Sequence, residues 1–136
     1  MKRFLVLCLL AFPAFAYETI IVNEVTSIYD ADTFRVNIKG WPPITGQRIP
    51  IRANGFDAPE IRGQCEQEKI GARKAKQLTV EALHNAEVIE LRDPKRGKYF
   101  RIIADVFIDG KSLRDMHLLA GTARPYSGGK RESWCK

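Results

Sequence analysis

The stretch TIIVNEVTSIYDADTFRVNI, residues 19–38, indicates the fold class of this chain. Its first part, residues 19–30, is rich in β-branched side chains and predicts a strand. The DADT segment at residues 30–33 predicts a turn, and the alternating residues 33–38 predict a returning strand. The chain is therefore expected to begin its fold with a β-hairpin whose turn carries two aspartates.

The segments that follow predict three further strands. Residues 39–47, KGWPPITGQ, are rich in glycine and proline and predict a loop, whereas the C-terminal residues 124–136 predict an irregular tail. A turn is expected at DPKRGK, residues 93–98. The predicted strands are RIPIRANGF at residues 48–56, EVIELR at residues 87–92 and YFRIIADVFI at residues 99–108.

Two helices complete the expected elements. Apolar residues near helical spacing predict one helix over residues 66–86. A second is expected over residues 111–121, where Ser112 and Asp115 suit a capping box and Gly121 suits a C-cap. Five strands with a helix between the third and fourth indicate a mainly β fold with α, a five-stranded OB-fold barrel with two to three helices.

The N-terminal residues have the pattern of an export signal. MKRFLVLCLLAFPAFA, residues 1–16, joins a basic start to an apolar run and ends in small residues, which is typical of a cleaved signal peptide. The apolar run is too short to span a bilayer. We therefore expect residues 17–136 to form one exported domain, periplasmic or secreted, with no membrane attachment, and we expect a monomer.

Charge and cysteine content fit this compartment. The formal net charge is +6, of which Lys2 and Arg3 contribute two, so residues 17–136 carry +4. This surplus favours an anionic partner such as nucleic acid, although ordinary solubility charge explains it equally well at this point. Cys65 and Cys135 are the cysteines outside the signal, and in an oxidising compartment they suggest one disulfide.

Carboxylates gather at two predicted strand ends. Asp30 and Asp32 lie in YDADTF, and Asp57 and Glu60 lie in the DAPE segment. Such residues are common in solvated turns. Carboxylates from two strand ends can instead hold one hard cation, with backbone carbonyls completing the shell.

Arginines inside apolar strands favour the second interpretation. Arg52 and Arg101 both lie in apolar segments, where a charge is costly unless it is paired. Such an arginine can lie at an edge of the barrel, with the aliphatic part of its side chain packed on the barrel. Its guanidinium can instead bind a phosphate through two hydrogen bonds. Arginines together with aspartates and a glutamate are the groups that a metal-assisted phosphodiesterase needs.

Four segments, taken in order, resemble the staphylococcal (micrococcal) nuclease family: YDADTFRV, RANGFDAPEIRG, GKYFRIIADVFIDGKSL and AGTARPY. The matching order covers Val22 to Tyr126. The resemblance implies an OB-fold barrel and a Ca²⁺-dependent enzyme that cleaves DNA and RNA to leave 3′-phosphate ends. It implies calcium ligands at Asp32, Asp57 and the Ala58 backbone carbonyl, and catalytic roles for Arg52, Glu60 and Arg101.

The resemblance also implies contacts with the nucleotide. Lys98 and Tyr99 match a pair that contacts the terminal phosphate, and Tyr126 lies near the family's base-stacking tyrosines. The chain departs from the family at Gly97 and Phe100, which stand where the family has aspartate and glycine.

An alternative function is a non-catalytic OB-fold module that binds single-stranded nucleic acid through stacking and charge. The acids argue against it, because Asp32, Asp57 and Glu60 repel phosphates unless a metal is bound. Outside the site, we expect His84 and His117 to lie on the surface and the GGKR segment, residues 128–131, to be a flexible end.

Overall fold

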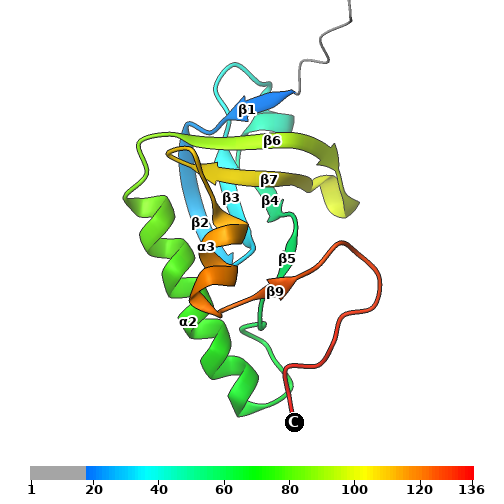
Figure 1. The fold of residues 1–136 in the computed structure, drawn as a ribbon. Coiled ribbons are helices and arrows are strands. Elements are labelled where there is room, and N and C mark those ends of the chain that lie inside the picture. Colours follow the sequence, from blue (N-terminus) through cyan, green and yellow to red (C-terminus); the bar gives the residue numbers. More distant parts are fainter. Residues whose placement is uncertain (1–17) are drawn as a thin grey trace, which may run out of the picture.

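A strongly curled sheet and three helices make up the OB-like fold in the computed structural model, which describes residues 18–136 (Figure 1). The predicted signal peptide lies outside the described residues. Within them, no helix is long and apolar enough to cross a membrane. The predicted mixture of a curled β-sheet with helices is confirmed.

The main sheet has the strand order β1-β6-β7-β4-β3-β2, with β8 added beside β7. Its strands pair antiparallel except for β4 and β7, which run parallel. A small second sheet pairs β5 with β9. The strands are β1 (Thr19–Ile21), β2 (Glu24–Asp30), β3 (Thr33–Asn37), β4 (Ile49–Ala53), β5 (Phe56–Asp57), β6 (Ile89–Arg96), β7 (Ile102–Ile108), β8 (Lys111–Ser112) and β9 (Arg124–Pro125).

The first predicted strand is divided into two. β1 pairs with β6 at one edge of the sheet, whereas β2 pairs with β3 at the other edge. Val22 and Asn23 join them, so a single covalent segment links both edges. The sheet is therefore curled into a half-barrel, and the five predicted strands correspond to β2, β3, β4, β6 and β7.

The core lies on the concave face of this sheet. In β4, Ile51 and Ala53 are buried, and the alternation of side chains places Arg52 on the opposite face. Phe34 and Val36 of β3 are buried in the same core and flank the exposed Arg35. The apolar alternation that predicts these strands thus also directs Arg52 away from the core.

Two long helices cover the half-barrel, and both were predicted. α2 (Glu66–His84) packs on β2 through buried side chains at helical spacing, Ala72, Ala75, Thr79 and Leu83. α3 (Leu113–Ala120) begins at Ser112, whose hydroxyl accepts a hydrogen bond from the Asp115 backbone N–H at 3.2 Å. It ends at Gly121, which adopts the left-handed conformation of a C-cap with φ of 70°.

Two predicted connections differ from the structure. The predicted loop at residues 39–47 contains a short helix, α1 (Pro43–Gly46), which begins with proline as helices often do. The predicted turn at residues 93–98 belongs mostly to β6, where a bulge between Arg92 and Lys95 accommodates Pro94. The chain reverses later, at the 3₁₀ turn η1 (Lys98–Phe100).

The prediction that His117 lies on the surface was also wrong, because its side chain is fully buried. Its Nε2 is 2.8 Å from the Thr79 hydroxyl, and its Nδ1 is 2.7 Å from the Thr122 hydroxyl. The ring also stacks on Phe56 with centroids 4.9 Å apart. The histidine therefore joins α3, α2 and β5 in the interior of the fold.

Candidate active site

A cavity of about 610 Å³ lies where the ends of β2 and β4 meet the C-terminal tail, residues 126–136. Arg52, Glu60 and Arg101 line it, as do Asp30 and Arg131. All three predicted catalytic residues therefore face one space. The two predicted calcium aspartates lie beside this space and contact residues of its wall.

Asp32 is buried and pairs with Arg52. Its Oδ2 forms an ion pair with Nη1 of Arg52, and its Oδ1 accepts a hydrogen bond from the Thr33 hydroxyl at 3.0 Å. Burial raises the pKa of Asp32, although the positive charge of Arg52 opposes that shift. The hairpin turn and the middle of β4 are thereby locked together, since Thr33 also pairs with Arg52 across the sheet.

Asp30 carries an unsatisfied carboxylate oxygen. Its Oδ1 is buried and has no hydrogen-bond partner among the described residues. Burial, and then the neighbouring charge of Asp32, raise the pKa of Asp30 to about 6. The negative charge of Glu60 adds to this effect, which places the three carboxylates in one electrostatic cluster.

Asp57 is surrounded by cationic and polar groups of the C-terminal tail and of β9. The carboxylate is only 1% exposed, and its Oδ1 accepts a hydrogen bond from Nε of Arg131 at 2.6 Å. Its Oδ2 accepts one from the Trp134 indole N–H at 3.1 Å. Nε of Arg124 lies 3.6 Å from the same Oδ2. Both oxygens of Asp57 thus have protein partners.

Arg131 joins Asp57 to the other groups of the DAPE segment. Its Nη2 donates to the Ala58 backbone carbonyl at 3.3 Å, and its Nη1 forms an ion pair with Glu60. Hydrogen bonds to these carboxylates raise the pKa of Arg131 above its usual range despite partial burial. A guanidinium therefore contacts two of the three predicted calcium ligands and the predicted catalytic glutamate.

Glu60 is held by the start of α2. The Glu68 carboxylate accepts hydrogen bonds from the backbone N–H groups of Glu60 at 3.4 Å and Gln64 at 2.9 Å. Glu68 is itself buried, so the loop between β5 and α2 is tied to the first turn of the helix. The Glu60 side chain remains 49% exposed and faces the cavity, where it can reach a bound molecule.

Arg101 also lines the cavity. It directly precedes β7, and its buried Nε has no hydrogen-bond partner among the described residues. β4 and β7 run parallel, with Arg52 opposite Ile103, so Arg52 in β4 and Arg101 just before β7 reach the cavity from neighbouring segments. An unpartnered guanidinium nitrogen beside a cavity is suited to an anionic ligand.

The predicted nucleotide-binding residues are divided between two places. Tyr126 lines the cavity, and its hydroxyl donates to the Gly129 carbonyl at 2.7 Å. Lys98 and Tyr99 lie on η1, at the tip of the β6–β7 hairpin, and do not line the cavity. Tyr99 is 90% exposed, and Phe100 beside it is also exposed, so this tip presents two aromatic rings to solvent.

The oxygen atoms of this cluster fit a hard cation. Asp32 and Asp57 supply carboxylates and Ala58 a carbonyl, which are the ligand types that Ca²⁺ prefers. The Arg131 guanidinium already places positive charge on the Asp57 and Ala58 oxygens. Within residues 18–136, the three side chains close enough together to hold a metal ion are Cys65, Glu68 and Cys135, but these cysteines are oxidised to a disulfide, and the aspartates do not form such a compact set.

That disulfide was predicted and is confirmed. It joins Cys65, which directly precedes α2, to Cys135 near the end of the chain. Figure 1 shows the tail leaving β9 as a wide loop and returning to the start of α2. The bond thus ties the tail to the loop that carries Glu60.

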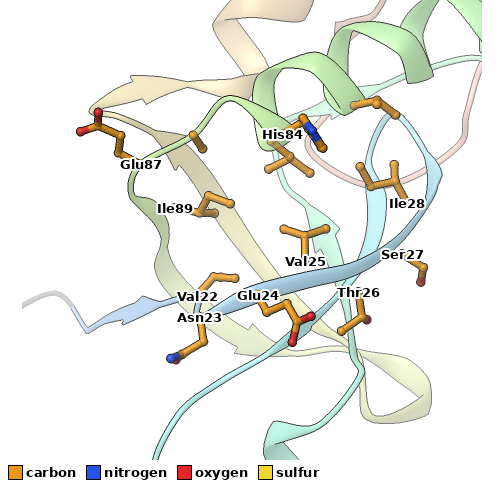
Figure 2. Close-up of a pocket in the computed structure, with 13 residues that line it drawn as sticks. Val22, Asn23, Glu24, Val25, Thr26, Ser27, Ile28, His84, Glu87 and Ile89 are labelled. Carbon is orange, nitrogen blue, oxygen red and sulfur yellow. The ribbon is translucent and has the colours of Figure 1, made fainter.

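A second cavity lies away from these residues. It has a volume of about 530 Å³ between β2 and the C-terminal end of α2 (Figure 2). Val25, Ile28 and Ile89 project into it, with Glu24, Glu87 and His84 at its rim. None of the predicted site residues lines this space.

Sequence reasoning missed the contribution of the tail to the site. Arg131 lies in the segment predicted to be a flexible end, yet it contacts Asp57 and Glu60. Trp134 and Arg124 were not predicted to contact Asp57 either. The predicted disulfide was a usable signal, because it requires the last residues to lie near the loop after Glu60.

Comparison with known proteins shows a distant similarity to a probable endonuclease. The probable endonuclease lcl3 of Pyrenophora tritici-repentis (strain Pt-1C-BFP) is 29% identical over 104 residues, which are 63% of this chain and 38% of that protein. The chain is a distant homologue of that protein and spans well under half of its length. No protein-family model matches the chain.

Proposed function

We propose that this chain is an exported, Ca²⁺-dependent nuclease that hydrolyses phosphodiester bonds of DNA and RNA and leaves 3′-phosphate ends. The observation that carries the proposal is the shared cavity of Arg52, Glu60 and Arg101 beside the buried aspartates. The distant relationship to a probable endonuclease supports the hydrolase class. The resemblance to the staphylococcal nuclease family supports the metal and the product ends.

In this proposal, each of the predicted catalytic residues that line the cavity has its own role. Arg52 in β4 and Arg101 just before β7 line the cavity and would bind the scissile phosphate through the guanidinium N–H groups. Glu60, the exposed carboxylate of the wall, would orient the attacking water and accept its proton. The arginines would stabilise negative charge as it develops on the phosphate oxygens.

Asp32, Asp57 and the Ala58 carbonyl would hold the calcium ion. When bound, the ion would supply a further positive charge to the phosphate oxygens. Asp30 lines the cavity, and its unpartnered oxygen can accept a hydrogen bond from a water molecule. Tyr126 would contact the nucleotide at the rim of the cavity.

One observation favours the alternative, a non-catalytic module that binds single-stranded nucleic acid. Asp32 is paired with Arg52, and Asp57 and Glu60 are paired with Arg131. The acids are therefore neutralised without a metal, which weakens the argument that they would repel nucleic acid. The exposed Tyr99 and Phe100 also offer stacking surfaces.

The test is cleavage of plasmid DNA and of a structured RNA by purified residues 17–136, with Ca²⁺ or with EDTA. We expect cleavage of both substrates with calcium, and none in EDTA. Ends that block polymerase extension until a phosphatase removes the 3′-phosphate would establish the product. Binding of labelled oligonucleotide without cleavage under any metal condition would favour the binding module instead.

A further inference from the structure

We propose that the C-terminal tail regulates this site, because Arg131 acts as an intramolecular cation that competes with calcium for the oxygens of Asp57 and Ala58. The inference rests on the proposed function, since it concerns the same cation site. It assigns to the tail a closed state, in which it contacts Asp57 and the Ala58 carbonyl, and an open state, in which it leaves these oxygens.

The closed state is defined by the contacts of Arg131. One guanidinium contacts the Asp57 carboxylate, the Ala58 carbonyl and the Glu60 carboxylate together. A calcium ion needs the first two of these groups as ligands, and the proposed water activation needs the third. The guanidinium and the ion cannot use these oxygens together, so binding of one requires departure of the other.

Trp134 strengthens the closed state. Its indole N–H donates to the second oxygen of Asp57, so the tail takes both oxygens of this carboxylate. The guanidinium of Arg124, on β9, stacks over the Trp134 ring at 3.8 Å. Release of Asp57 by the tail therefore requires both Arg131 and Trp134 to leave it.

The chain holds the tail close to the site from both ends. At its start, the Tyr126 backbone N–H donates to the Gly55 carbonyl at 3.1 Å. Near its end, Cys135 is bonded to Cys65. Between them, Gly128 and Gly129 adopt positive φ angles of 107° and 85°, which only glycine adopts readily, and these turn the chain back toward Asp57. Such a tether gives the guanidinium a high effective concentration.

The consequence for calcium is a reduced apparent affinity. When only a fraction of molecules has a free site, the apparent dissociation constant rises by the inverse of that fraction. Loss of the Arg131 guanidinium should therefore tighten calcium binding, and calcium should in turn release Trp134 from Asp57.

The experiment measures calcium binding by titration calorimetry, in the absence of nucleic acid, with the disulfide intact. Three proteins are compared: the parent, Arg131→Gln and Lys130→Gln. Lys130 is the neighbouring exposed residue, so its replacement removes the same charge without touching Asp57. We expect Arg131→Gln to bind calcium about tenfold more tightly, as for a site open in about one parent molecule in ten. Lys130→Gln should stay within about twofold of the parent.

A second measurement needs no variant. The indole N–H signals of Trp41 and Trp134 are followed by NMR during a calcium titration of the parent. The Trp134 signal should shift with calcium because its bond to Asp57 is lost, whereas Trp41, beside α1, is the internal reference.

Equal calcium affinities in Arg131→Gln and Lys130→Gln would overturn competition by the tail, as would calcium binding that leaves the Trp134 signal unchanged. Absence of calcium binding in all three proteins would instead overturn the calcium site of the proposed function, and the regulation with it.

Discussion

Replacing Arg52 by alanine should lower both turnover and stability, because this side chain has a proposed catalytic role and a structural one. It faces the cavity proposed to bind the scissile phosphate, and it pairs with the buried Asp32. A preorganised charged contact of this kind contributes about 3–4 kcal/mol to the transition state, so turnover should fall roughly a hundredfold to a thousandfold.

The stability effect follows from the ion pair. Removal of one partner from a fully buried pair costs about 3–5 kcal/mol. The Arg52 side chain is 19% exposed, and burial already raises the pKa of Asp32, so the lone carboxylate can take up a proton. We therefore expect the free energy of unfolding to fall by about 2–3 kcal/mol at neutral pH, below the value for a fully buried pair.

Lysine at the same position separates the two effects. An ammonium still neutralises Asp32, so Arg52→Lys should recover part of the stability. It lacks the two-pronged donor geometry of the guanidinium, so turnover should stay low. The matched control is Arg35→Ala on β3, which removes an equally charged but exposed side chain that bonds only the Arg48 carbonyl among the described residues.

The assays are cleavage of a short labelled DNA, binding of that DNA without calcium, and urea unfolding. Turnover should fall more than DNA affinity, because the contact is strongest in the transition state. A folded Arg52→Ala protein that cleaves at the parental rate would refute the catalytic role. Unchanged stability would refute the importance of the pair with Asp32.

Other predictions concern the disulfide, a buried histidine and the metal. Non-reducing mass analysis of the mature protein should show the loss of two protons from the disulfide cysteines, and two alkylatable thiols in native protein would contradict the bond. Cys135→Ser should lower the free energy of unfolding by roughly 4 kcal/mol. Burial lowers the pKa of His117 to about 4 from its ordinary 6.5, so the unfolded chain binds its proton first. The contribution of neutral His117 to the free energy of unfolding is fully present above pH 6.5. It should decline by roughly 3 kcal/mol as the pH falls to 4. Parallel pH–stability curves for the parent and His117→Gln would argue against this. EDTA should abolish cleavage and calcium should restore it, with Mg²⁺ a weaker activator, and full activity in EDTA would exclude a metal role.

Periodic features of the sequence predicted most of the fold. The alternation in β3 and β4 and the capping residues of α3 are local signals, and the structure follows them. The division of residues 19–30 into β1 and β2 depends on pairing with distant strands, which no local pattern contains. His117 looked like a surface residue for the same reason, since its partners Thr79 and Thr122 lie on other segments.

The candidate site shows the same division between local and distant information. The acidic residues of the DAPE and DADT segments can be identified from the sequence alone, and so can Arg52, because it is a charged residue in an apolar strand. Arg131 follows Gly129 and Lys130 and precedes Glu132, in a segment with no periodic pattern. Its neighbours in the sequence therefore do not indicate which residues it contacts. Its position comes from the tether of the tail and from the buried charge of Asp57.

The parallel pairing of β4 with β7 has a consequence for how quickly the protein folds. These neighbouring strands are separated in the sequence by the whole of α2 and β6. Contacts between such distant segments close long loops and slow the search for the native state, so a barrel of this kind is expected to fold in milliseconds to seconds. Arg52 and Arg101 would then come together only late in folding, after the loop between these strands has closed.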